Sequence, residues 1–132
     1  MHTFGGATSS PFDPELVHDG NWQPLSGYEA TRELMAIRTP PTAIFCANDF
    51  MAVGCYEALR ELGLRIPDDV AVIGYDDREI GRHLHPPLST MLLPHFEMGA
   101  IAAEILIDGG AGALDPPRQI KVECPVVMRR SV

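Results

Sequence analysis

Two short apolar runs, each ending in polar residues, constrain the fold of this chain more than any other feature. The first run, residues 42–46 (TAIFC), is followed by Asn48 and Asp49, and the second, residues 70–73 (VAVI), is followed by Gly-Tyr-Asp-Asp. Short uncharged runs of this kind are typical of strands buried in a parallel sheet. Because ligands of open α/β sheets bind beyond the carboxyl ends of the strands, the two polar ends predict a ligand cleft.

Between the two runs, apolar residues recur at the spacing of a helix. The predicted helix begins with Asp49 as its N-cap and ends before Gly63, a residue type common just past a helix end. Its predicted buried face consists of Met51, Ala52, Cys55, Ala58, Leu59 and Leu62. A strand, a helix and a second strand in this order predict a right-handed βαβ unit in a parallel sheet.

Further elements are predicted on both sides of this unit. They are a short strand at 16–18, a helix from a capping box at Ser26 and Glu29 to about Ile37, an extended segment at 89–93, a helix at 96–107, and a strand or strand pair at 120–128. Residues 78–87 are polar and are expected to form a loop with a helical turn. Glycines at 109, 110 and 112 predict a surface turn.

Composition and charge exclude several classes of function. The chain has 132 residues and a formal net charge of −8, which argues against gripping nucleic acid through its phosphates. No run approaches the roughly 18 apolar residues of a membrane span. The first six residues have neither the basic region nor the apolar core of a secretory signal. We therefore expect a cytoplasmic location and no membrane contact.

The three cysteines are Cys46, Cys55 and Cys124. Their odd number and wide spacing are not typical of a disulfide framework or a zinc site. The sequence predicts three buried free thiols in a reducing compartment.

The polar strand ends supply the candidate ligand residues. Asp76 can accept two hydrogen bonds from neighbouring hydroxyls of a sugar or ribose, although an Asp at a strand end also often caps the next turn. Asn48 offers both a donor and an acceptor, which suits a hydroxyl-rich ligand. For Asp49, a helix-capping role is the simpler interpretation.

Two aromatic residues extend this set. Trp22 is the only tryptophan and follows the first predicted strand, so it can serve either as a partly buried anchor or as a surface that stacks on a sugar ring. His95 begins the predicted helix at 96–107 and is expected to face the cleft.

Little in the sequence points to a cofactor or an enzyme. There is no Gly-rich phosphate loop and no nucleophile elbow, and His83 and His85 lack the partners of a metal site. A magnesium-dependent phosphotransfer domain is an alternative, because acids at strand ends can hold Mg²⁺, but no lysine or phosphate-binding loop accompanies them. We expect no cofactor and no catalytic residues.

Two stretches together resemble the effector-binding domain of the LacI/GalR family of bacterial transcriptional regulators. They are residues 41–54 (PTAIFCANDFMAVG) and 66–77 (IPDDVAVIGYDD), and the later Pro-Pro-Leu-Ser-Thr, Glu-Met-Gly and Arg-Arg-Ser segments keep the order expected in that family. The resemblance covers residues 16–132. A transport receptor of the same periplasmic-binding-protein-like fold is the alternative, but the Pro-Asp-Asp-Val element is more typical of the regulators.

The resemblance implies an α/β fold with a doubly wound parallel sheet, present as an incomplete fragment. It implies an irregular leader at 1–15, the C-terminal subdomain at 16–92, a helix of the N-terminal subdomain at 93–118, and a returning strand at 119–132. The implied ligand contacts are Asp76, Asn48 and Trp22, with His95 on the apolar side of the ligand; Leu93 stands where family members often have a Gln.

The resemblance also implies partners. The effector would be a sugar, polyol or nucleoside, and operator DNA would be bound only through a missing N-terminal domain. A homodimer is expected to pair through the face near residues 51–56 and the loop near 78–84. A central strand of the family, between 16–18 and 42–46, is not recognisable here. We therefore expect residues 1–20 to be irregular, or the sheet to be completed by dimerisation or swapping.

Overall fold

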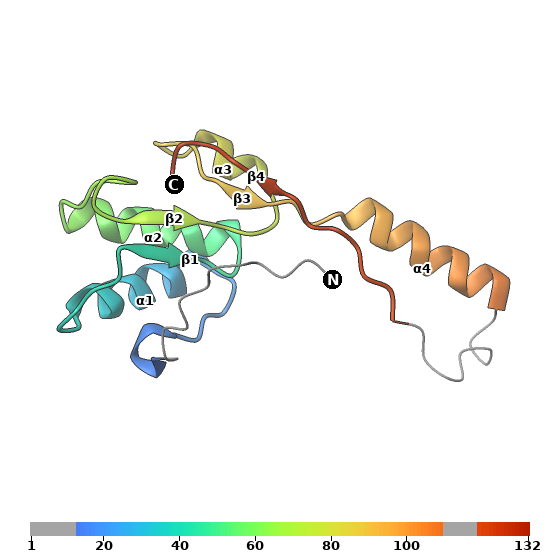
Figure 1. The fold of residues 1–132 in the computed structure, drawn as a ribbon, viewed down its shortest axis with the longest axis horizontal. Coiled ribbons are helices and arrows are strands. Elements are labelled where there is room, and N and C mark those ends of the chain that lie inside the picture. The colour runs from blue at the N-terminus through green and yellow to red at the C-terminus, as the bar shows by residue number, and fades with distance from the viewer. Residues whose placement is uncertain (1–12, 110–118) are drawn as a thin grey trace, which may run out of the picture.

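A computed structural model of the chain describes residues 13–109 and 119–132. In chain order the elements are the 3₁₀ helix η1 (Pro14–Leu16), α1 (Pro24–Ala36), β1 (Ala43–Phe45), α2 (Asp49–Glu61), β2 (Ala71–Ile73), α3 (Glu79–His83), β3 (Thr90–Met91), α4 (His95–Gly109) and β4 (Val126–Val127). Helices α1 and α2 lie together against the strands β1 and β2, whereas α4 projects away from this body (Figure 1).

The predicted βαβ unit is present. Strands β1 and β2 are parallel neighbours, with Ile44 opposite Val72, and helix α2 connects them. The N–H of Cys46 donates to the carbonyl of Ile73 at 2.8 Å, so the pairing continues to the end of both strands. Gly63 has a φ of 71° just past α2, which confirms the predicted helix end.

The other edge of β2 is occupied by segments far along the chain. The N–H of Val72 donates to the carbonyl of Ser131 at 2.8 Å, and Ser89 forms a parallel bridge with Ile73. Strand β3 then pairs antiparallel with β4. As a result, the segment that ends the chain lies beside β2 and β3 (Figure 1).

The core forms where α1 and α2 pack on one face of the sheet. It contains Leu34 of α1, Ile44 of β1 and the following Cys46, five residues of α2 (Met51, Ala52, Cys55, Tyr56 and Leu59), and Val70, Val72 and Leu88. The two helices touch backbone to backbone: a Cβ at Gly54 would overlap the carbonyl oxygen of Pro24, and one at Gly27 would overlap that of Met51. Glycine is therefore required at both positions for this close approach.

Helix α1 begins differently from the prediction. Ser26 was expected as the N-cap, but Pro24 is the first helical residue and Gln23 takes the cap position without a side-chain bond. The Ser26 hydroxyl instead accepts from the N–H of Asn21 at 3.1 Å and donates to the carbonyl of Gln23 at 2.9 Å. The fixed φ of a proline at the first position sets the helix start here, ahead of the capping-box pattern.

The predicted strand at 16–18 is absent. Between residues 13 and 20, only η1 has regular structure, while Leu16 and Val17 are 43% and 58% exposed. A strand needs a neighbour for its backbone hydrogen bonds, and among the described residues β1 is paired only with β2. The irregular segment is tied to α1 by an ion pair between His18 and Glu33, with 2.9 Å between Nδ1 and Oε2. The leader expected at 1–12 lies outside the described residues.

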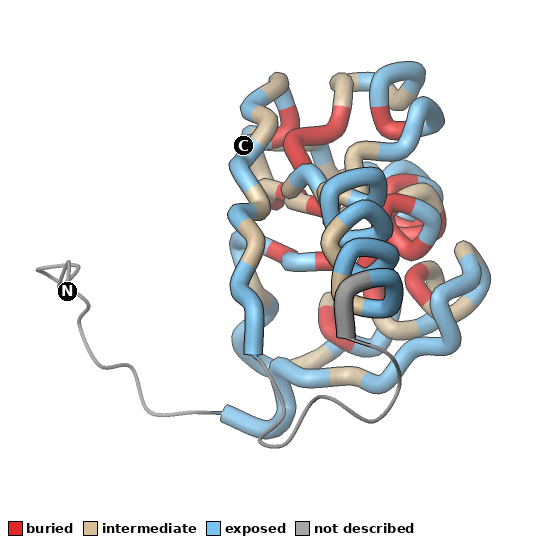
Figure 2. Tube along the Cα trace, turned by 90° about the vertical axis from the view of Figure 1, so that its right-hand side faces the viewer, coloured by how far each residue is buried: buried red, intermediate tan, exposed pale blue. Residues whose placement is uncertain are grey.

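Helix α4 confirms the predicted helix, but most of its apolar side chains have no cover. Phe96 is 90% exposed, and Leu106 and Ile107 are 66% and 81% exposed. In Figure 2 the buried segments gather in the body, and the tube of α4 is mostly exposed. The glycine turn predicted from residue 110 lies outside the described residues. Of the predicted strand at 120–128, only β4 forms.

The cysteines are free, as predicted. Cys46 and Cys55 are buried, whereas Cys124 is only half-buried and its sulfur accepts a hydrogen bond from the Tyr75 hydroxyl at 3.3 Å. Within the described ranges, no helix is both long and apolar enough to cross a membrane.

Candidate functional site

At the start of α2, Asn48 takes the capping role that was predicted for Asp49. Asn48 is the N-cap, and its Oδ1 accepts from the N–H of Met51 at 2.8 Å. Asp49 is the first helical residue and caps nothing in its own helix, so the predicted capping role for Asp49 is wrong. Asn and Asp are equally good N-caps, and the choice between adjacent ones depends on contacts from elsewhere in the chain.

Those contacts hold the Asp49 carboxylate completely buried. One oxygen accepts from the N–H of Arg78 at 2.6 Å, and the other accepts from the Thr90 hydroxyl at 2.7 Å. Burial raises the pKa of the Asp49 carboxyl, and the hydrogen bonds from Thr90 and Arg78 offset part of that rise.

Asp76 lies in the loop that follows β2, in an unusual backbone conformation. Its φ is 112°, and its N–H donates to the carbonyl of Met91 at 2.9 Å. Its side chain is 13% exposed and lies 3.6 Å from the guanidinium of Arg78. Such φ values cost roughly 1–3 kcal/mol and gather at functional sites, so this carboxylate is held in place by its surroundings.

Asp77, the next residue, is committed to ion pairs. Its carboxylate meets Arg129 and lies 3.2 Å from Arg82. Although burial alone would raise the pKa of the Asp77 carboxyl, the two guanidinium groups hold it below its ordinary value. Asp77 therefore serves the structure of the loop, which leaves Asp76 as the candidate ligand residue.

Trp22 and Asn48 are brought together. The Asn48 amide donates to the carbonyl of Trp22 at 3.1 Å, and Trp22 has a φ of 67°, which is rare for a bulky residue. The side chain of Trp22 is 61% exposed, so its ring is available for stacking. Of the two interpretations made from the sequence, the geometry favours a surface residue over a buried anchor.

Asn48 and Asp76 follow neighbouring parallel strands and are linked through the backbone. The N–H of Asp49 donates to the carbonyl of Tyr75 at 2.9 Å, which ties the end of β1 to the end of β2. His95 lies further along, at the exposed start of α4. Three of the four predicted ligand residues thus share one edge of the sheet, and His95 is not joined to them by a side-chain hydrogen bond within the described residues.

The sequence analysis did not predict the residues that bind this edge of the sheet from distant positions in the chain. Ser131 accepts from the N–H of Ser89 at 2.8 Å and donates to the carbonyl of Val72 at 2.6 Å, and Arg129 donates to the carbonyl of Leu88 at 2.7 Å. These partners are about 40 to 60 residues apart in the chain, so no local pattern could reveal them. The Arg-Arg-Ser segment was noticed only through the family resemblance.

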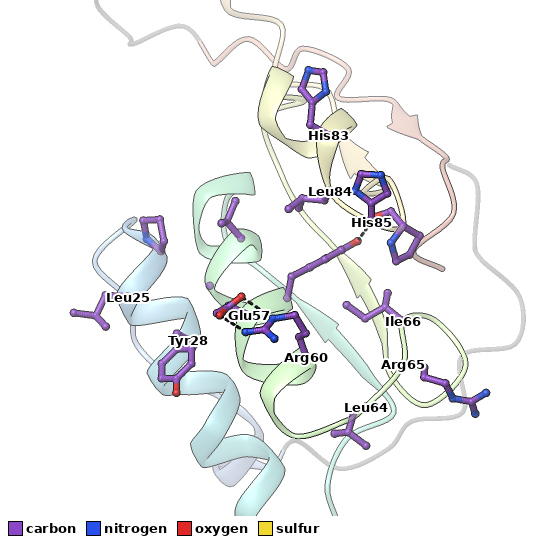
Figure 3. Close-up of a pocket in the computed structure, with 15 residues that line it drawn as sticks. Leu25, Tyr28, Glu57, Arg60, Leu64, Arg65, Ile66, His83, Leu84 and His85 are labelled. Atoms are coloured by element: carbon purple, nitrogen blue, oxygen red, sulfur yellow. Dashed lines mark hydrogen bonds and ion pairs between the residues drawn. The ribbon is translucent and has the colours of Figure 1, made fainter.

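The surface of the described residues is hollowed on both sides of α1. One hollow, of about 570 Å³, lies between the segment at 16–22 and β1, and Trp22 and Phe45 are among the residues that line it. The other, of about 970 Å³, lies on the helical face away from the strand ends, between α1, α2 and the loop at 83–86 (Figure 3). Within the described part of the chain, no three His, Cys, Asp or Glu residues gather as a metal site would require.

Fold and candidate site together define an α/β domain with polar groups at the carboxyl ends of neighbouring parallel strands. A family model described as periplasmic binding protein-like domain matches residues 7–132. The chain belongs to this family, and it is homologous to the effector-binding domain of LacI-family regulators.

Individual relatives agree with this assignment. The protein named HTH-type transcriptional repressor PurR, from Yersinia pestis (strain Pestoides F), is 38% identical over 122 residues, which is 92% of this chain and 36% of that protein. A complex of the transcriptional regulator CelR with cellobiose matches with a TM-score of 0.86 and 34% identity, over 96% of this chain and 38% of that one.

A structure of the Lac repressor dimer bound to operator and the anti-inducer ONPF matches with a TM-score of 0.76 and 32% identity, over 85% of this chain and 39% of that one. The chain thus spans little more than a third of the length of the relatives that it matches.

Proposed function

We propose that this chain forms part of the effector-binding domain of a LacI-type transcriptional regulator and contributes one wall of a pocket for a sugar, polyol or nucleoside. The observation that carries the proposal is the meeting of Trp22, Asn48 and the loop of Asp76 at one sheet edge. Two of these three residues have positive φ values, which a protein maintains only where the surrounding structure holds them.

Each residue has a chemical role in this proposal. Asp76 accepts hydrogen bonds from ligand hydroxyls, and such charge-assisted bonds are roughly twice as strong as neutral ones. Asn48 uses one acceptor site for α2 and one donor for Trp22, which leaves one donor and one acceptor site for a ligand. The exposed Trp22 ring stacks on an apolar ligand face. His95 lies on the apolar side of the ligand.

We also propose the division into subdomains that the family resemblance implies. In this division, residues 16–92 belong to the C-terminal subdomain. Residues 93–118 supply a helix to the N-terminal subdomain, and residues 119–132 form the returning strand. The exposed apolar side chains of α4 support this division, because a helix of this composition needs a partner surface. The opposite wall of the pocket comes from that second subdomain.

In this function the protein is not an enzyme and needs no cofactor. The effector shifts the balance between two arrangements of the subdomains, and operator DNA is contacted by a separate N-terminal domain. The regulator would act in the cytoplasm. A transport receptor of the same fold is the second candidate, and a sequence that begins upstream with a signal peptide instead of a helix-turn-helix would favour it.

A homodimer is proposed through the helical face that carries the larger hollow. Leu25 is 65% exposed there, and Val53 and Leu84 line the same hollow (Figure 3). The dimeric Lac repressor structure supports this assembly for a homologue. Sedimentation of the full-length protein should show a dimer and a Leu84→Glu variant should dissociate; a wild-type monomer would contradict the proposal.

Ligand binding is tested by thermal shift. The full-length protein is screened against sugars, polyols and nucleosides, cellobiose included, because a ligand that binds only the folded state raises the melting temperature. We expect at least one stabilising ligand and the loss of its effect in an Asp76→Ala variant. Stabilisation that survives this substitution would contradict the assigned site, and a folded protein stabilised by no member of the panel would contradict the proposed ligand class.

A further inference from the structure

The carboxylate of Asp49 is buried, and its position in helix α2 does not explain this burial. Asp49 is completely buried, and Asn48 provides the N-terminal cap of α2. Burial of a charge is costly unless hydrogen bonds compensate for it. The start of a helix favours a negative charge, but that alone requires neither complete burial nor the two specific donors that meet this side chain.

Those donors come from the loop that carries Asp76. The backbone N–H of Asp49 binds the carbonyl of Tyr75 at 2.9 Å, and its carboxylate accepts from the N–H of Arg78 at 2.6 Å. Asp49 therefore contacts the residues immediately before and after the pair 76–77. It is hydrogen-bonded to both ends of this short loop.

The same carboxylate reaches the middle of the loop through Thr90. The Thr90 hydroxyl donates to Asp49 at 2.7 Å and accepts from the N–H of Asp77 at 3.4 Å. Gly74 closes the remaining side, since a Cβ there would overlap the Asp49 carboxylate. This tight packing leaves no room for the carboxylate to turn away from the loop.

The loop needs such a support because of its backbone. Asp76 and Asp77 have φ values of 112° and 53°, both in a region that non-glycine residues rarely adopt. Without external hydrogen bonds, two consecutive residues of this kind would relax to more common conformations and turn the Asp76 side chain away from its present direction.

We propose that Asp49 is a positioning residue for Asp76: it fixes the loop at 75–78 so that the Asp76 carboxylate is presented to the ligand. Asp49 itself does not touch the ligand. This inference rests on the proposed function, because it assumes that Asp76 is the ligand contact. In this proposal Asp49, the acidic member of the Asn48-Asp49 pair, preorganises the site, which reduces the cost of ordering it on binding.

The test compares Asp49→Ala, Asp49→Asn and Thr90→Val with Asp68→Asn, an exposed control that removes the same charge away from the loop. Amide hydrogen exchange of the unliganded protein is measured at Arg78 and Asp76, with Cys46 in the β1–β2 pairing as reference. Loss of the acceptor should speed exchange at Arg78 by about tenfold or more in Asp49→Ala. The effect should be smaller in Asp49→Asn, which keeps one acceptor, and the rate at Cys46 should not change.

Binding is then measured with cellobiose first, followed by the panel member that stabilises the wild-type protein most. Asp49→Ala should weaken binding about tenfold or more, and Asp68→Asn should not. Exchange at Arg78 within twofold of wild type, equal acceleration at Cys46, or unchanged ligand affinity would each overturn the positioning role. If no panel member binds the wild type, the proposed ligand class fails, and the exchange rates still decide whether Asp49 fixes the loop.

Discussion

Helices α2 and α4 were predicted from the same kind of apolar spacing, yet they have opposite surroundings. In α2, Ala52, Cys55 and Leu59 are completely buried against α1 and the sheet. In α4, Phe96 and Ile107 remain 90% and 81% exposed, although this helix is rich in Ile, Leu and Ala. The difference shows that an apolar stripe on a helix indicates that the helix packs against a partner surface. The stripe does not indicate whether that surface belongs to the same chain.

Substituting one glycine in each helix tests the contrast in packing between α2 and α4. Gly54→Ala in α2 should destabilise the chain by about 3 kcal/mol, because the added methyl group would overlap the Pro24 carbonyl and force α1 and α2 apart. Gly99→Ala in α4 meets nothing within 4 Å and should stabilise the helix by about 0.5–1 kcal/mol. Urea unfolding followed by circular dichroism measures both. Similar effects of the two substitutions would contradict the contrast.

A second pair of substitutions removes apolar side chains. Leu59→Ala in α2 should cost about 2–5 kcal/mol, because it leaves a cavity in the core. Phe96→Ser in α4 should change the free energy of unfolding by no more than about 0.5 kcal/mol. If Phe96→Ser is as costly as Leu59→Ala in the isolated chain, α4 packs against another surface in solution.

The smallest expected effect is a pH dependence of stability that arises at the start of α2. The pKa of Asp49 is raised in the folded chain, so the folded state binds more protons than the unfolded state between the ordinary value of 3.8 and the raised value. The contribution of this group to stability is therefore present below pH 3.8 and is lost as the pH rises through that window.

Asp77 acts in the opposite direction. Its pKa is lowered by Arg129 and Arg82, so its contribution is present above pH 3.8 and is lost as the pH falls through its folded value. Asp49→Asn should remove the loss of stability on raising the pH above 3.8, while the Asp68→Asn control should retain it. Unfolding by urea at several pH values measures this, and an unchanged slope in Asp49→Asn would contradict the raised pKa.

The sequence was sufficient for the elements whose signals are local. The βαβ unit, the end of α2 at Gly63 and the position of α4 follow from apolar spacing and from the conformational freedom of glycine. The strand expected at 16–18 did not form, because a strand depends on a neighbour that its own residues do not specify.

The candidate site was predictable only where its residues are marked by local sequence signals. Asn48 and Asp76 were predicted as ligand residues because they follow β1 and β2, whereas Trp22 was predicted from a strand at 16–18 that does not form. Which of Asn48 and Asp49 caps α2 was not predictable, since Thr90 and Arg78 decide it from 29 or more residues away. The identity of the ligand could not be predicted from this chain, because the opposite wall of the proposed pocket comes from the second subdomain.

Trp22 gives this site an optical reporter of its own. It is the only tryptophan in the chain, its side chain is 61% exposed, and its backbone is hydrogen-bonded to Asn48. In this chain, light emitted by tryptophan therefore originates from a single loop, and a ligand that stacks on the indole would remove the ring from water. Changes in emission wavelength and quenching by iodide would then follow occupancy of the site in real time, without any attached dye.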